Sequence, residues 1–217
     1  HPICFSDGHG EPDLDEDMDG NGFGILDLAL AGLNYSTHRV ELLGTGEVPE
    51  MCRVFVATAV SRDWTPDELT ALKRYLADGG QVLALPFLPP TELDETNPRP
   101  YVQQLSVEFN SSLSEYGVWV GATAIEEYSE SNRLPEETDA STFLVSRPGR
   151  MPHPIIDSLD QSIIVRRAPP LSAMDTDGVI VESLLTSTGN SRARENLSTE
   201  GSWTWLNGPI PLAMAMT

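Results

Sequence analysis

The residues best suited to chemistry lie in a glycine-flanked loop near the start of the chain. A short apolar run from Pro2 to Phe5 leads into the loop Ser6-Asp7-Gly8-His9-Gly10-Glu11. Its glycines would let the backbone approach a ligand, while His9 and Glu11 offer a base and an acceptor. After the first strand of an open α/β sheet, such a loop lines the crevice at the carboxyl ends of the strands. We therefore predict a ligand-binding loop over Asp7, Gly8, His9, Gly10 and Glu11. The alternative is a tight turn in which His9 bonds to a neighbouring loop.

An acidic run continues this loop as far as Asp19. Asp15, Asp17 and Asp19 occupy alternate positions and precede a glycine. They match the first half of a calcium loop, in which alternate carboxylates converge on one hard cation. The second half does not match, because position twelve is Leu26 and not glutamate. The run predicts either a calcium site at the three aspartates or a solvated loop whose carboxylates favour the positive start of the next helix.

A catalytic nucleophile is harder to find. Cys4 and Cys52, the two cysteines of the chain, both precede apolar runs, which indicates two buried small side chains or one bridge between neighbouring strands. Ser61 follows a third strand but lacks the G-x-S-x-G context of a strained nucleophile. We expect Ser61 to be a turn or helix-entry residue and not the catalytic partner of His9.

Alternating helices and strands must position these groups. Apolar residues recur at helical spacing over 25–33, 65–78 and 102–116. The second helix has the clearest start, because Thr65 to Glu68 form a capping box with proline at the first helical position. Strand patterns lie between the helices, over 2–5, 38–42, 54–59, 81–85 and 118–120. The order βαββαβαβ predicts an α/β fold with a mostly parallel, doubly wound, flavodoxin-like sheet.

The second half of the chain has weaker patterns. The segment 126–160 is polar and proline-rich, and we expect it to be irregular. Later strand candidates lie over 163–165, 179–181 and 212–216, with loops such as 186–196 between them. We expect these strands to complete the same domain, so that 1–217 is a single α/β domain. The chain begins without methionine and reads as a fragment of a longer protein.

The charge balance excludes several kinds of partner. The chain has 33 Asp and Glu against 13 Lys and Arg, and a formal net charge of -20. Such a field repels nucleic-acid phosphates and anionic lipid headgroups, and no basic run offsets it locally. The arginines at 166, 167, 192 and 194 are too sparse to form an anion-binding surface. No apolar run is long enough to span a bilayer.

Two tryptophans near the end of the chain share one side of an extended segment. Trp203 and Trp205 flank Thr204, so their side chains would point the same way from a strand. They could form a contact patch for a partner or a glycan. The pattern favours packing within a core or a sheet.

Several motifs together carry a family resemblance. They are Gly8-His9-Gly10-Glu11, Glu47-Val48-Pro49, Thr65-Pro66-Asp67-Glu68-Leu69, Tyr75-Leu76, Gly79-Gly80, Glu115-Tyr116-Gly117-Val118, His153-Pro154-Ile155, Gly208-Pro209 and Pro211-Leu212-Ala213. Because it has these motifs in this order, the chain resembles the extracytoplasmic domain of gliding-motility-type (GldG-like) ABC transporter auxiliary proteins. It is also similar to a domain of an intraflagellar transport protein.

This resemblance implies a flavodoxin-like sheet related to the class I glutamine amidotransferases, tethered by membrane helices outside this chain. In those enzymes a cysteine sits on an elbow after a central strand, whereas here that strand runs out as Ala57-Thr58-Ala59-Val60-Ser61. The resemblance therefore implies a non-enzymatic accessory or recognition domain on the periplasmic side of the inner membrane. It would contact ABC permease or ATPase subunits or a transported cargo, as a possible oligomer, without a cofactor other than calcium. The alternative is an amidotransferase-like enzyme, or a sugar- or small-ligand-binding module, that uses the crevice from Asp7 to Glu11.

Overall fold

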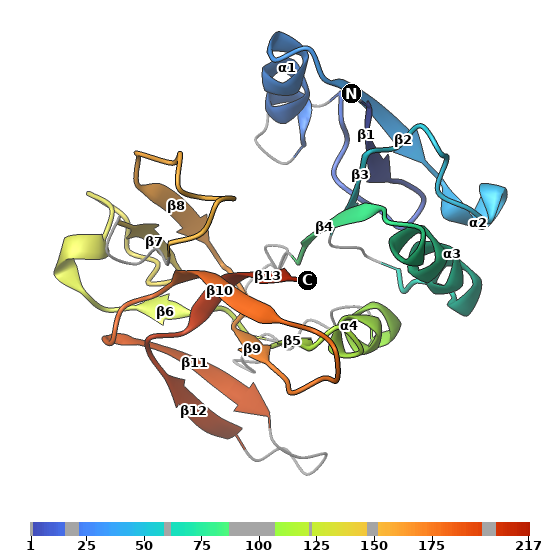
Figure 1. The fold of residues 1–217 in the computed structure, drawn as a ribbon. Helices are drawn as coiled ribbons and strands as arrows, with labels where there is room; N and C mark the ends of the chain where they lie inside the picture. Colours follow the sequence, from blue (N-terminus) through green and yellow to red (C-terminus); the bar gives the residue numbers. More distant parts are fainter. Residues whose placement is uncertain are drawn as a thin grey trace, which may run out of the picture. The chain divides into compact units, whose positions relative to one another are not determined.

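The computed structural model describes residues 2–15, 22–58, 62–86, 107–121, 123–146, 152–196 and 203–217. The chain divides into two compact units, which are described separately below (Figure 1). Unit 1 comprises His1–Pro86 and Leu105–Phe109, and unit 2 comprises Phe87–Gln104 and Asn110–Thr217. No helix among the described residues is long and apolar enough to cross a membrane. That all 217 residues form one domain stays a prediction.

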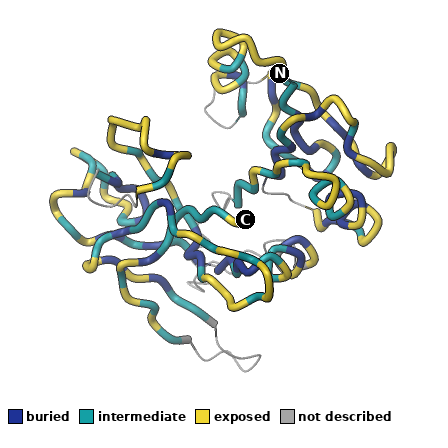
Figure 2. The backbone as a smooth tube through the Cα atoms, in the orientation of Figure 1, coloured by how far each residue is buried: buried dark blue, intermediate teal, exposed yellow. Residues whose placement is uncertain are grey.

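Unit 1 is built on a four-stranded parallel sheet in the order β2-β1-β3-β4. Its strands are β1 (Pro2–Ser6), β2 (Ser36–Val40), β3 (Val54–Thr58) and β4 (Gln81–Leu85). Ile3 of β1 pairs with Thr37 on one side and with Val54 on the other. β3 is almost entirely buried because it lies inside the sheet, and this explains its continuous apolar run (Figure 2). The prediction of an α/β fold with a parallel sheet is confirmed for these strands.

Helices contact both faces of this sheet. Leu30 of α1 (Gly24–Gly32) packs on one face against Phe5 and Val56. On the other face Phe55 contacts Trp64, which lies just before α3 (Pro66–Ala77), at a ring-centroid distance of 6.3 Å. A short helix, α2 (Leu42–Thr45), follows β2. Alternate residues of β1 and β3 therefore serve two different apolar layers.

The ends of both long helices follow the sequence signals. At the start of α3, Thr65 and Glu68 form the reciprocal capping box, and Asp78 caps the other end. Asn34, just after α1, adopts the left-handed conformation with φ 63°, which asparagine tolerates better than most residues. The helix predictions over 25–33 and 65–78 are confirmed to within a residue or two.

A disulfide joins Cys4 of β1 to Cys52, two residues before β3. The two Cα atoms are 5.6 Å apart, and both side chains are buried. The bridge between neighbouring strands, one of the two alternatives for these residues, is therefore the one observed. It closes a loop with a sequence separation of 48 residues around β2 and both helices α1 and α2.

Unit 2 differs from the prediction for the second half of the chain. After α4 (Val107–Ser114), which crosses the unit boundary, β5 (Val118–Val120) pairs antiparallel with β9 (Leu171–Ala173). The expectation that 118–120 would extend the parallel sheet is wrong for these residues, because their partner is a strand from much later in the chain. Gly117, with φ 79°, ends the turn before β5.

The other strands of unit 2 also pair antiparallel. They are β6 (Glu126–Glu127), β7 (Thr142–Val145), β8 (Ile163–Arg166), β10 (Val181–Thr186), β11 (Ser191–Asn196), β12 (Trp203–Asn207) and β13 (Pro211–Met216), with a short helix η1 (Glu130–Asn132). Two segments expected to lack regular structure therefore contain strands: 126–160 holds β6 and β7, and 186–196 holds β11. β7 and β11 are strands because tertiary partners bury one face of each, through Phe143 and Ala193 in a shared core with Ile210.

Candidate functional site

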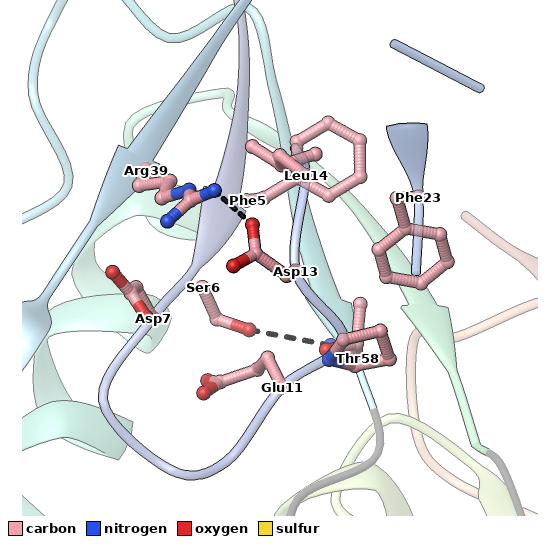
Figure 3. Close-up of a pocket in the computed structure, with 10 residues that line it drawn as sticks. Phe5, Ser6, Asp7, Glu11, Asp13, Leu14, Phe23, Arg39 and Thr58 are labelled. Atoms are coloured by element: carbon pink, nitrogen blue, oxygen red, sulfur yellow. Dashed lines mark hydrogen bonds and ion pairs between the residues drawn. The ribbon is translucent and has the colours of Figure 1, made fainter. Parts of the chain in front are cut away.

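The candidate site lies where the order of the sheet reverses. The chain proceeds outward from β1 to β2 and then returns to β3 on the other side of β1. A crevice is expected between β1 and β3 at their carboxyl ends, because the connections leave in opposite directions there. A pocket is found at this edge, between Ser6 at the end of β1 and Thr58 at the end of β3 (Figure 3).

The pocket is small and polar. Its volume is about 70 Å³, whereas pockets for drug-sized ligands start at roughly 300 Å³. Asp7, Glu11 and Asp13 line it together with Arg39 of β2, and the Arg39 guanidinium pairs with the Asp13 carboxylate across it (Figure 3). Ser6 Oγ accepts a 3.4 Å hydrogen bond from the Thr58 amide. The pocket has room for a few waters or a small ion, and not for a sugar.

The glycine-flanked loop forms a tight turn, and that it binds a ligand stays a prediction. Gly8 and Gly10 have φ values of 108° and 85°, a region that other residues rarely occupy. The Gly8 carbonyl accepts a hydrogen bond from Arg62, and the Arg62 amide donates to the His9 carbonyl at 3.1 Å. Asp7 is exposed and accepts from the Gly8 amide. These bonds hold the loop against the segment that enters α3.

His9 is the centre of a buried cluster that this turn creates. Only 5% of the residue is exposed, and it is not among the residues that line the pocket. Its Nδ1 lies 3.2 Å from Glu11 Oε1, and its Nε2 lies 3.0 Å from Glu68 Oε1. Its ring stacks on Trp64, with the ring planes 7° apart and the centroids 5.2 Å apart. Both ring nitrogens therefore face carboxylates.

Glu68 links the cluster to the start of α3. Its Oε2 accepts hydrogen bonds at 2.8 Å from both the amide and the hydroxyl of Thr65. Its Oε1 faces His9, so one buried carboxylate serves the capping box with one oxygen and the histidine with the other. Glu68 is 1% exposed, and a buried carboxylate needs such partners because desolvation disfavours its charge.

The electrostatics of the cluster favour an ion pair network. The hydrogen bond to Glu11 is the largest cause that raises the pKa of His9 above its ordinary value near 6.5, with Glu68 adding to it and burial opposing it. Burial acts to raise the pKa of both carboxylates, but hydrogen bonds hold each pKa below its ordinary value near 4.5. The two carboxylates thus favour the protonated form of His9 over the neutral form.

This arrangement is poorly suited to acid–base catalysis. A general base needs a free lone pair within reach of a substrate proton. Both ring nitrogens of His9 instead lie against the carboxylates of Glu11 and Glu68 inside the protein. The described geometry gives His9 a structural part, which joins the β1 loop to α3.

The acidic loop is described only in part. Asp17 and Asp19 lie outside the described residues, and so does Ser61, the candidate partner of His9. Asp15 is exposed, and its carboxylate lies 2.7 Å from the Arg39 guanidinium, which also pairs with Asp13. Within the described residues no three acidic, histidine or cysteine side chains form a group that could hold a metal ion. Calcium at Asp15, Asp17 and Asp19 stays a prediction, in which the cation would compete with Arg39.

A wider hollow of about 450 Å³ lies at the opposite edge of the sheet. It is lined by the segment that precedes β3 and by the last turns of α3, including Arg53, Arg74 and Tyr75. The Tyr75 hydroxyl donates a 3.2 Å hydrogen bond to the Cys52 carbonyl, next to the disulfide. Acidic residues of both segments also line this hollow, so that charges of both signs alternate around it and indicate no single ligand class.

Several residues of the cluster were not identified as site residues from the sequence. Glu68 is predicted only as part of the capping box. Trp64 of the cluster, and Arg39, which lines the pocket, are not among the predicted site residues. The sequence does hold a signal for Glu68. The capping box places this carboxylate at the start of the helix that follows β3, and β3 is the neighbour of β1, so Glu68 lies near the loop after β1. No local signal identifies Trp64 or Arg39, since their contacts depend on how β1, β2 and α3 come together.

The comparisons with known proteins agree on the fold only. Neither a family model nor a curated protein matches this sequence. Among solved structures, the chain is similar to one described as "mmIFT52 N-terminal domain", with a TM-score of 0.60 and 17% sequence identity. The similarity covers 87% of this chain and 79% of that one. It supports the intraflagellar-transport part of the resemblance and shows a shared mixed α/β fold.

Proposed function

We propose that this chain is a non-enzymatic extracytoplasmic accessory or recognition domain of an ABC-type transport system, for export or gliding motility. Its work would be contact, either with the permease and ATPase subunits or with a cargo. The single observation that carries the proposal is the disulfide between Cys4 and Cys52.

The disulfide supports both parts of this proposal. It involves the two cysteines of the chain, so neither is a thiolate that could act as an amidotransferase-type nucleophile. Disulfides persist mainly in oxidising compartments, such as the periplasm or the outside of the cell. Membrane segments that tether the domain would lie outside this chain.

An exposed apolar helix supports a contact role. Ile25 and Leu28 of α1, and Leu33 directly after it, are exposed to 67%, 65% and 68%. Much of this helix is coloured as exposed (Figure 2). Asp27 is the only charged residue of this helix, and its carboxylate accepts a hydrogen bond from the Thr37 hydroxyl. Exposed apolar patches of this kind mark protein contacts more often than ordinary surface.

The location can be tested by trapping thiols in cells that produce the full-length protein. Because both cysteines are buried, the cells are first quenched with acid and the protein is denatured. We then expect a maleimide reagent to label neither cysteine unless a reductant is added first. A cytoplasmic protein with two exposed cysteines serves as a control and should be labelled at once. If Cys4 and Cys52 are labelled without reductant, the extracytoplasmic location is wrong.

The transporter assignment needs a separate test. We expect a permease and an ATPase to co-purify with the full-length protein from detergent-solubilised membranes. The Leu28→Glu variant should lose them, whereas Ile164→Glu, which changes an equally exposed apolar residue of β8, should keep them. If no ABC subunit co-purifies with the wild-type protein, the transporter proposal fails.

A further inference from the structure

The solvent-facing side of the β6, β11 and β12 sheet carries an unusual set of side chains for this acidic chain. The three strands pair antiparallel in the order β12-β11-β6. Ala193 of β11 and Leu206 of β12 face the core of unit 2. The alternation of a strand therefore sends Arg192, Arg194 and Trp205 to the other side. Trp205 is 43% exposed.

On this face the rings of Tyr128 and Trp205 stack with the guanidinium groups of Arg192 and Arg194, and this stack is called the ladder below. The Arg192 guanidinium carbon lies 4.7 Å from the ring centre of Tyr128 and 4.3 Å from that of Trp205. Arg192 also bonds to the Tyr128 hydroxyl at 2.7 Å and to Glu126 at 3.2 Å. The Arg192 charge is therefore balanced by Glu126, and these contacts hold the side chains of the ladder in one arrangement.

Arg194 occupies a different position in the ladder. Its guanidinium carbon lies 4.8 Å from the Trp205 ring centre, so this side chain from the middle strand extends over the edge strand. Its main chain bonds to Thr123, but within the described part of the chain no carboxylate forms an ion pair with its guanidinium. The chain has 33 acidic and 13 basic residues, so a guanidinium that pairs with no carboxylate of the described residues is unusual in it.

β12 also offers main-chain hydrogen bonds. It is a terminal strand of its sheet, and among the described residues only β11 pairs with it. The outward amide and carbonyl groups of such an edge can pair with an added strand. A strand placed there would send alternate side chains to the ladder face, beside Trp205 and Arg194, and the others to the core face, beside Leu206.

We infer that β12 binds an extended segment of a partner protein that alternates acidic and apolar side chains. The acidic side chains would meet the Arg194 guanidinium, and the apolar ones would extend the core beside Leu206. Main-chain pairing favours a peptide over a lipid or a glycan. This inference does not depend on the transporter assignment.

The test uses the whole chain and a fluorescein-labelled heptapeptide that alternates glutamate with valine. We expect saturable binding by fluorescence anisotropy, and no binding of the peptides in which glutamine or lysine replaces glutamate. Arg194→Gln should weaken binding about tenfold, the usual effect of losing one hydrogen bond to a charged group. Arg166→Gln, which removes an exposed arginine from β8, is the matched control and should bind as the wild type does.

Two further measurements separate strand addition from simple charge attraction. N-methylation of alternate amides of the peptide should abolish binding, because it blocks main-chain pairing without changing charge. Circular dichroism will establish that Arg194→Gln is folded, and Arg194→Lys should recover part of the affinity. The inference is overturned if the glutamine peptide binds equally or if no binding occurs at about 1 mM peptide. It is also overturned if sedimentation shows a dimer that Arg194→Gln disrupts, since a second copy then occupies this face.

Discussion

At the scale of single residues, His9 holds a loop in place by bonding on both sides of its ring. Glu11 comes from the same loop and Glu68 from the start of α3, so the histidine connects two segments that are far apart in sequence. The stacked Trp64 ring excludes water from one face of this contact. The cluster should therefore matter for the stability of unit 1 more than for any reaction.

We predict that His9→Gln lowers the free energy of unfolding by about 2 kcal/mol near pH 5.5, because it removes the hydrogen bond to Glu11 and the close charge contact with Glu68. The raised pKa of His9 means that its contribution is complete below pH 6.5 and is lost as the pH rises through the folded-state pKa. The lowered pKa of each glutamate means that their contribution is lost as the pH falls below about 4.5. The difference between wild type and variant should be largest between these values.

Urea unfolding at several pH values measures this difference. His38→Gln, which changes an exposed histidine of β2, is the control and should have little effect at any pH. A His9→Gln effect that is the same at pH 5.5 and at pH 8.5 would show that charge on His9 does not contribute.

At the scale of elements, the disulfide fixes the pairing of β1 with β3. In the chain-entropy model, closing a loop with a separation of 48 residues stabilises the folded state by about 4 kcal/mol. We predict that reduction, or the double substitution Cys4→Ala and Cys52→Ala, lowers the urea midpoint of unit 1 correspondingly. Dithiothreitol should shift the wild type and leave the double variant unchanged. A wild-type midpoint that is insensitive to the reductant would contradict the prediction.

The capping box offers a second test at this scale. Thr65→Ala removes the acceptor and donor that Thr65 provides to Glu68, and we expect a loss of about 1 kcal/mol. Thr70→Ala, on the exposed face of the same helix, should be neutral or slightly stabilising, because alanine favours the helix.

Because Thr65 and His9 both act through Glu68, their substitutions should not be additive. The double variant with Thr65→Ala and His9→Gln should therefore lose an amount of unfolding free energy that differs from the sum of the two single losses. Thermal unfolding of the four proteins in this cycle provides the measurement. Strict additivity would mean that the two oxygens of Glu68 act independently.

At the scale of the whole molecule, the charge of -20 makes the folded chain repel itself. Salt screens this repulsion, with a Debye length that falls from about 30 Å at 0.01 M to about 3 Å at 1 M. We therefore predict that sodium chloride raises the melting temperature over this range. Calorimetry measures the melting temperature. A parallel series with a neutral osmolyte, which is excluded from the protein surface but screens no charge, separates charge screening from exclusion. A melting temperature that falls with salt would indicate that favourable ion pairs, such as Arg39 with Asp13, outweigh the repulsion.

From sequence alone, the helices α1 and α3 and the buried strand β3 of unit 1 could be predicted, because their signals are local. β2 begins two residues earlier than the predicted strand over 38–42, and α2 was not predicted. Thr65 and Glu68 are three residues apart, so they form a capping box wherever the helix begins, and the buried run at 54–58 could only be an interior strand. The glycine-flanked turn at 8–10 is local in the same way, since its glycines adopt conformations that few other residues tolerate.

Which strands pair, and which side chains meet in the candidate site, became known only from the tertiary structure. Strand pairing depends on contacts between distant residues, so no window of sequence showed that β5 would join β9 or that 191–196 would be a strand. The same holds for the candidate site. The turn after β1 was predictable, but its histidine lies buried beside Glu68 and Trp64 because α3 and the residue just before Thr65 pack against this loop. Local sequence specifies conformation, whereas burial and electrostatic partners come from long-range packing.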